Sequence, residues 1–190
     1  MRQLSSLEPR HTAARLFLLG EHVGGEEVEQ AFINTGVEGL LELGLLIPVE
    51  NEPTQGVSYR AALSLTPVES PQSEVSWWIL SDLDDHLRTA PAHPQHVMGV
   101  GKATRSLICA LPGSPVERAL DLGTGNGLVA LWLTSIAQQV VASDISDRAL
   151  MFAEANATLN DVNITLARGN LFEPVGEDQF DLIATNPPFV

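Results

Sequence analysis

The second half of the chain, residues 112–190, alternates short apolar runs with longer amphipathic runs. The apolar runs have the length of buried strands, and the runs between them repeat their apolar residues at helical spacing. Strands that alternate with helices predict an α/β fold with a parallel, doubly wound sheet. The predicted strands are 116–122, 140–143, 164–167 and 180–185, and the predicted helices are 128–137 and 147–159, the latter capped by Ser146.

The first 85 residues follow a different order, in which helices come first and strands follow. Apolar spacing and glycine breaks predict short helices at 10–20, 26–33 and 37–43, followed by strand-like runs at 45–49 and 59–66. Three short helices followed by a hairpin is the order of a winged-helix module. We therefore predict a small winged-helix-like α+β domain over residues 1–85.

Residues 75–111 join these two parts of the chain. Residues 75–85 read as a further strand, in which Trp77 and Trp78 would point to opposite faces. Residues 86–111 are predicted to be a linker and a lead-in helix, with the helix lying within 97–111. The third predicted segment, 112–190, is the α/β part.

The charge of the chain is strongly acidic and unevenly spread. The formal net charge is −14, and residues 1–85 carry four arginines against fourteen acidic residues. The third predicted helix, 37–43, contains two glutamates and no cation, so it would repel phosphate groups. We expect the N-terminal module to position a substrate or bind a partner, with DNA reading as the minor alternative.

Sequence features also bear on location and on metals. No apolar run reaches the about 20 residues of a membrane span, and the N-terminus lacks a signal-peptide pattern, so a cytoplasmic location is expected. The single cysteine, Cys109, lies in an apolar run and is expected to be buried. Pro94 separates His93 from His96, so no metal site is expected there.

The stretch DLGTGNG, residues 121–127, follows a predicted strand and opens a predicted helix. Glycines at such a turn let the backbone bend tightly and approach a ligand closely. A dinucleotide-binding fingerprint would need glycine or alanine where Leu128 stands, and Asp121 would lie close to a pyrophosphate. The turn therefore favours a ligand with a cationic or neutral group over a dinucleotide.

Two further positions complete a predicted nucleoside cleft. Asp144 ends the second strand, about 20 residues after the glycine turn, where an acid accepts hydrogen bonds from ribose hydroxyls. Asn170 and Leu171 follow the third strand, where an adenine would lie in the same cleft.

The stretch NPPF, residues 186–189, follows the fourth strand. Each residue before a proline is held extended, so the corner holds the Asn186 side chain and the Pro187 carbonyl in fixed directions. Two rigid acceptors can bind the hydrogens of a planar amino or amide nitrogen and expose its lone pair. Phe189 offers a flat face against which a planar acceptor can stack.

Together these motifs resemble a class I S-adenosylmethionine-dependent methyltransferase, and most of all its small-domain branch. That branch holds the release-factor glutamine and the ribosomal RNA guanine-N2 methyltransferases. The resemblance covers about residues 97–190. It implies a partial Rossmann-like sheet, with residues 112–190 as the first half of the catalytic domain, and S-adenosyl-L-methionine as cofactor.

The resemblance also assigns roles to individual residues. It implies that Asn186, Pro187 and Phe189 serve the acceptor nitrogen. The residues implied to hold the cofactor are Asp121, Gly123, Thr124, Gly125, Gly127, Asp144, Ile145, Asn170, Leu171 and Asn186. The acceptor is either an RNA or DNA base or a protein glutamine, and no membrane partner is expected. The alternative is a non-catalytic nucleoside-binding and protein-interaction module.

The family's sheet has seven strands, of which this sequence supplies the first four. We therefore expect a truncated and by itself inactive piece of a longer enzyme. Strand 180–185 would form an apolar open edge, which favours self-association.

Overall fold

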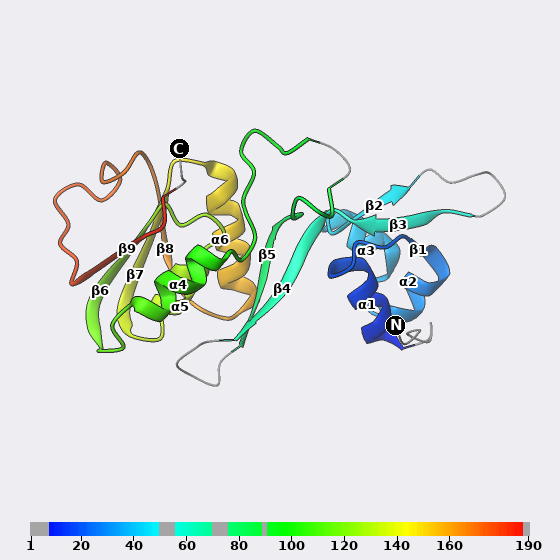
Figure 1. Cartoon of the computed structure of the whole chain (residues 1–190), viewed down its shortest axis with the longest axis horizontal. Helices are drawn as coiled ribbons and strands as arrows, with labels where there is room; N and C mark the ends of the chain where they lie inside the picture. Colours follow the sequence, from blue (N-terminus) through cyan, green and yellow to red (C-terminus); the bar gives the residue numbers. More distant parts are fainter. Residues whose placement is uncertain (1–7, 50–55, 70–75, 89–90, 188–190) are drawn as a thin grey trace. The chain divides into compact units, whose positions relative to one another are not determined.

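The computed structural model describes residues 8–49, 56–69, 76–88 and 91–187. Contacts between residues divide the chain into two compact units (Figure 1). The first contains Met1–Leu65 and Asp82–Ala90, and the second contains Thr66–Ser81 and Pro91–Val190. The sequence predicts the first domain boundary at residue 85, whereas residues 66–69 and 76–81 make their contacts with the second unit.

The first unit combines three short helices with a small antiparallel sheet. Its elements are α1 (Pro9–Phe17), β1 (Val23–Gly24), α2 (Gly25–Ala31), α3 (Gly36–Glu42), β2 (Leu46–Val49) and β3 (Ser58–Ala61). The sheet order is β1-β3-β2, and its core includes Leu16, Val28 and Leu46. The three predicted helices are observed, but the short strand β1 between α1 and α2, which pairs with β3, was not predicted. The winged-helix assignment itself stays a prediction.

The predicted strand at 59–66 is two strands, so this part of the sequence prediction was wrong. β3 ends at Ala61, where it pairs with Leu46, and β4 (Leu63–Glu69) begins a different, two-stranded sheet with β5 (Ser76–Asp82). The apolar pattern runs through both strands without a break. The separation comes from their different partners in space.

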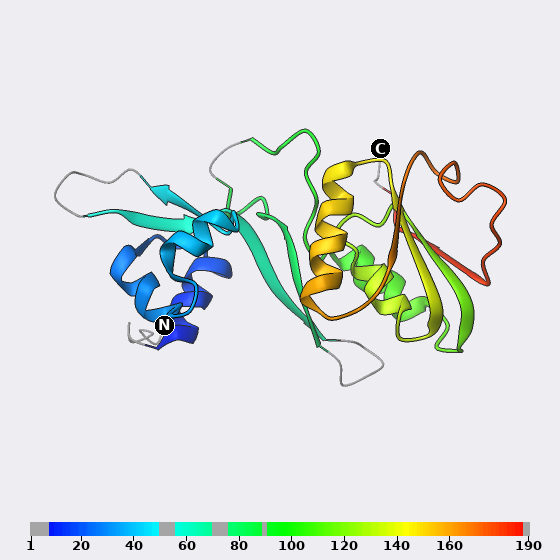
Figure 2. The ribbon, with the colours of Figure 1, turned by 180° about the vertical axis from the view of Figure 1, so that it is seen from behind.

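The second unit contains a four-stranded sheet in which neighbouring strands run parallel. The strands are β6 (Val116–Leu122), β7 (Ala137–Asp144), β8 (Thr165–Arg168) and β9 (Leu182–Thr185), in the order β8-β7-β6-β9. This confirms the predicted parallel sheet. Figures 1 and 2 show the helices α4 (Lys102–Ala110), α5 (Leu128–Leu133) and α6 (Asp147–Leu159) together on one side of it.

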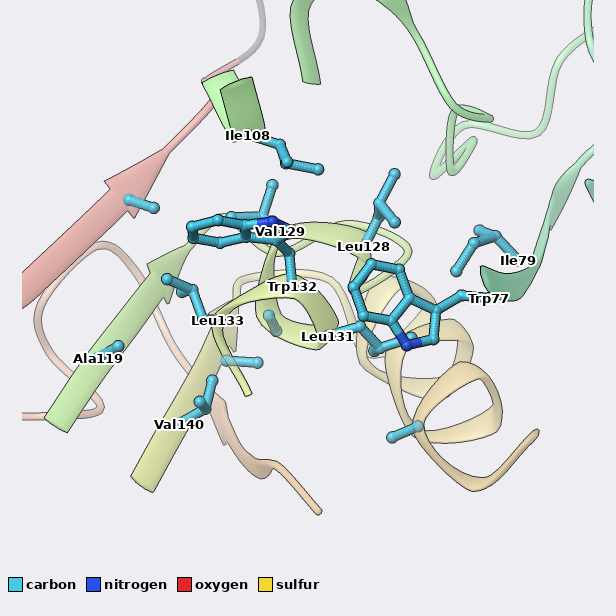
Figure 3. Close-up of a cluster of buried hydrophobic side chains, with 14 of the residues drawn as sticks. Trp77, Ile79, Ile108, Ala119, Leu128, Val129, Leu131, Trp132, Leu133 and Val140 are labelled. Carbon is cyan, nitrogen blue, oxygen red and sulfur yellow. The ribbon is translucent and has the colours of Figure 1, made fainter. Parts of the chain in front are cut away.

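Helix α5 is shorter than predicted because β7 begins at Ala137. All six residues of α5 are buried. Figure 3 shows Trp77 and Ile79 of β5 beside Leu128 and Leu131 of α5 in the core of the second unit. Trp77 is 4% exposed and Trp78 is 50% exposed, which confirms that the two rings point to opposite faces.

Three further expectations concern the surface. β9 is an edge strand of the four-stranded sheet, and self-association through it stays a prediction. Cys109 is exposed, so the expectation of a buried thiol was wrong; it lies on the outer side of α4, whereas the neighbouring Ile108 is buried. Across the described parts of the chain, no helix has the length and apolar character needed to span a membrane.

Candidate functional site

The glycine loop, residues 123–127, connects β6 to α5 at the carboxyl end of the sheet. Gly123, Gly125 and Gly127 have φ values of 76°, 56° and 85°, which side chains rarely tolerate. A Cβ added at Gly123 or Gly125 would meet no atom within 4 Å, so the backbone there faces open space. At Gly127 it would lie 3.0 Å from Ala153, because α6 packs directly against the loop. The loop is thus closed on its helix side and open toward a ligand.

Asp121 lies under this loop and is 2% exposed. Its Oδ2 accepts hydrogen bonds from Thr124 Oγ1 at 2.6 Å and from the Ala130 amide at 2.9 Å. Burial raises the pKa of Asp121 to about 6, and the negative charge of Asp144 adds to that rise. The hydrogen bonds from Thr124 and Ala130 oppose it. These contacts give Asp121 and the Thr124 hydroxyl a structural task, which is to fasten the loop to the first turns of α5.

Asp144 stands at the end of β7, beside the loop. Its Oδ2 accepts a hydrogen bond from the Gly125 amide at 3.0 Å, and its Oδ1 accepts one from the Ser146 amide at 2.9 Å. Each carboxylate oxygen can accept a further hydrogen bond, so both can still bind hydroxyl groups of a ligand. The next residue, Ile145, is 66% exposed and offers an apolar face at the same edge of the sheet.

The loop after β8 carries the predicted adenine-binding residues. The Gly169 amide donates to the Asp144 carbonyl at 3.1 Å, which holds the ends of β8 and β7 together. Asn170 is exposed, and Leu171 is 63% exposed with a φ of 50°. A non-glycine residue in the left-handed region is unusual, and such strain often occurs at ligand-binding loops.

The predicted acceptor corner follows β9. Thr185 pairs with Leu122 across the sheet, and its Oγ1 donates to the Leu122 carbonyl at 2.8 Å, so the corner begins next to the glycine loop. Asn186 Nδ2 donates to Thr104 Oγ1 of α4 at 3.1 Å. Pro187 is exposed, whereas Phe189 lies outside the described residues.

The sequence motifs do not predict the supporting roles of two residues at the site. Thr104 orients the amide of Asn186, and Asn126 holds the loop by donating from Nδ2 to the Met98 carbonyl at 3.0 Å. Asn126 Oδ1 also accepts from the Leu128 amide at 3.1 Å. An asparagine just before a helix is a common N-terminal signal and could have pointed to Asn126. Nothing local points to Thr104.

The structure therefore gathers the predicted residues that it describes at the carboxyl ends of β6, β7, β8 and β9. This is where open α/β sheets bind ligands. An open backbone loop, a strand-end carboxylate and exposed apolar side chains at Ile145 and Leu171 suit a nucleoside with a methionine-like tail. The residues thus fit the cofactor that the sequence implies.

Comparison with known proteins agrees with this geometry. Residues 97–190 match the family model described as "Methyltransferase small domain", and residues 1–57 match a "Domain of unknown function (DUF7059)". The match over residues 97–190 confirms the resemblance to the small-domain methyltransferases that the sequence motifs carry.

Two curated relatives match part of this chain. A release factor glutamine methyltransferase of Geobacter sulfurreducens is 41% identical over 73 residues, covering 37% of this chain and 26% of that protein. A ribosomal protein uL3 glutamine methyltransferase of Bradyrhizobium diazoefficiens is 46% identical over 79 residues, covering 40% of this chain and 25% of that protein. The chain thus matches about a quarter of the length of these relatives.

A 16S rRNA N2-guanine methyltransferase of T. thermophilus, solved with AdoMet and guanosine, has a similar fold. Its TM-score is 0.54 at 20% identity, and the match covers 89% of this chain and 46% of that one.

Proposed function

We propose that this protein takes part in transferring a methyl group from S-adenosyl-L-methionine to the side-chain amide nitrogen of a glutamine in another protein. The observation that carries this proposal is the meeting of the glycine loop, Asp144 and the Asn186 corner at one edge of the sheet. The first two are suited to the cofactor, and the third is suited to a planar nitrogen.

The cofactor would be held by three parts of the chain. Gly123 and Gly125 leave room for close approach of the methionine part, and Asp144 has free acceptor capacity for ribose hydroxyls. Ile145 and Leu171 supply exposed apolar faces for the adenine. When bound, the cofactor supplies a methyl group on a positively charged sulfur.

The acceptor amide would be held by the corner. Because Asn186 Nδ2 is engaged by Thr104, its Oδ1 can turn toward an N–H of the incoming amide. The Pro187 carbonyl provides a second acceptor. Two fixed acceptors orient the nitrogen and favour its pyramidalisation, which makes its lone pair available for methylation. Catalysis of this kind consists mainly of positioning and placement of charge.

Two observations favour a protein glutamine over a nucleobase. The net charge of −14 repels a phosphate backbone. The relatives reported above with 41% and 46% identity are glutamine methyltransferases. In the first unit, α3 exposes Glu38 and Glu42, so this module suits a positively charged protein partner better than a nucleic acid.

The test is incubation of the protein with methyl-labelled cofactor and cell extract, followed by separate protease and ribonuclease digestion. We expect label that protease releases and ribonuclease does not, located on glutamine by mass spectrometry. Label released by ribonuclease would replace the glutamine by a nucleobase. Cofactor binding without any transfer would support the alternative of a non-catalytic nucleoside-binding module.

A further inference from the structure

Asn156 on α6 and Asn160, which caps the C-terminus of this helix, bind the backbone of strand β5. Figures 1 and 2 show β5 beside α6, and both elements belong to the second unit. Asn160 accepts from the Trp78 amide at 2.9 Å and donates to the Trp78 carbonyl at 2.9 Å. One turn earlier, Asn156 accepts from the Leu80 amide at 2.7 Å and donates to the Leu80 carbonyl at 2.9 Å. The two side chains thus act as a neighbouring strand would.

The two asparagines differ in their remaining hydrogen bond. Asn160 uses its second N–H within the helix, on the Asn156 carbonyl at 2.7 Å. Asn156 instead donates to the Asn126 carbonyl in the glycine loop at 2.7 Å. Asn156 is 0% exposed, and these three bonds engage both of its amide hydrogens and its oxygen. A buried amide is costly to leave unpaired, so its orientation is fixed.

The contact between α6 and the loop extends over two consecutive loop residues. Asn156 binds the carbonyl of Asn126, and Ala153, one turn earlier, packs so closely that a Cβ added at Gly127 would lie 3.0 Å from it. The peptide between Asn126 and Gly127 is therefore held from the helix side. At Gly123 and Gly125 the loop faces open space, which the proposed function assigns to the cofactor.

We propose that Asn156 is a positioning residue for the glycine loop, and that β5 determines its orientation through the backbone of Leu80. This rests on the proposed function in so far as the loop binds the cofactor. The strand pair β4–β5 is in this way linked to cofactor affinity without touching the cofactor. Displacement of β5 would free the Asn156 amide and release the Asn126 carbonyl.

The test compares Asn156→Ala with Asn160→Ala, which removes the same kind of bond to β5 but none to the loop. Both should lower the melting temperature. Only Asn156→Ala should weaken binding of S-adenosylhomocysteine in calorimetry, by about tenfold for one lost buried hydrogen bond. It alone should also speed hydrogen exchange at the Gly127 amide, which bonds to the Thr124 carbonyl. Equal effects of the two variants on binding and exchange would overturn the proposal.

A second pair of variants tests the part played by β5. Leu80→Pro removes the backbone N–H that donates to Asn156 Oδ1. Trp78→Pro removes the backbone N–H that donates to Asn160 Oδ1. We expect faster Gly127 exchange in the first only, and unchanged exchange in both would refute the role of β5. Hydrogen exchange needs no ligand, so it decides this inference even if the wild-type protein fails to bind S-adenosylhomocysteine. That failure would count against the proposed function alone.

Discussion

Asp144 at the end of β7 is fastened to Gly125 in the middle of the glycine loop, with its Oδ2 3.0 Å from the Gly125 amide nitrogen. The predicted ribose-binding acid and the predicted methionine-binding loop are thus parts of one hydrogen-bonded unit. A ligand that binds one of them meets the other already in place, which lowers the entropic cost of binding.

Asp144→Ala should weaken cofactor binding by about 10- to 100-fold, since hydrogen bonds to a charged group contribute about 1.5–3 kcal/mol each. Isothermal titration with S-adenosylhomocysteine measures this. Asp147→Ala is the matched control, because that carboxylate forms an exposed ion pair with Arg168. If both variants bind equally well, Asp144 does not hold the ribose.

Asn186→Ala should lower the rate of methyl transfer by about a hundredfold while cofactor affinity stays near that of the wild type, because the role proposed for Asn186 is to hold the acceptor. Thr104→Val removes the hydroxyl that engages Asn186 and should lower the rate by about tenfold. Thr104→Ser keeps that hydroxyl and should restore the rate. Transfer measured with labelled cofactor and a saturating acceptor gives all three values. Near-normal transfer by Asn186→Ala would make the corner structural.

Asp121 should make folding stability depend on pH in an unusual direction. Its pKa is about 6 in the folded protein and 3.8 in the unfolded chain, so the folded state holds a proton that the unfolded state releases. The contribution of this carboxyl to stability is therefore full below pH 3.8 and is lost as pH rises through about 6. The loss amounts to roughly 3 kcal/mol at 1.36 kcal/mol per pKa unit.

Asp121→Asn removes this titration and nearly preserves the shape of the side chain. Urea unfolding of both proteins, at about pH 4 and about pH 7, should show the variant gaining stability relative to the wild type at the higher pH. A difference that does not change with pH would show that Asp121 titrates normally.

Trp77→Ala should cost about 3–5 kcal/mol in the free energy of unfolding, as expected when a buried aromatic side chain is removed. Trp78→Ala, on the exposed face of the same strand, should cost no more than about 1 kcal/mol. Denaturant titration of the two variants measures this contrast. Similar costs would mean that β5 is not an integral part of the core.

Much of the second unit could be predicted because its signals are local. The bounds of β6 and α6 agree with the predicted ranges 116–122 and 147–159, and Ser146 accepts from the Ala149 amide as the predicted cap. Apolar periodicity, a glycine turn and a cap are each set within a few residues. They were therefore enough to predict the parallel sheet.

The sequence also located the candidate site at the strand ends, because parallel strands bring their carboxyl ends to one edge. It did not separate residues that face a ligand from those that support the loop. Asp121 was expected to contact the cofactor region, whereas its carboxylate is buried beneath the loop and bound to Thr124 and Ala130. Burial of a charged group depends on which side of the loop it lies, and the motif does not reveal this.

The sequence by itself determined the α/β alternation, the glycine loop and the stiff Asn-Pro corner, because each depends on neighbouring residues. Only the tertiary structure decided that Thr104 orients Asn186 and that Asn156 connects Leu80 to Asn126. These partners lie 82, 76 and 30 positions apart. Local spacing carries no information about such pairs. They form because packing buries polar groups that must find a hydrogen-bond partner.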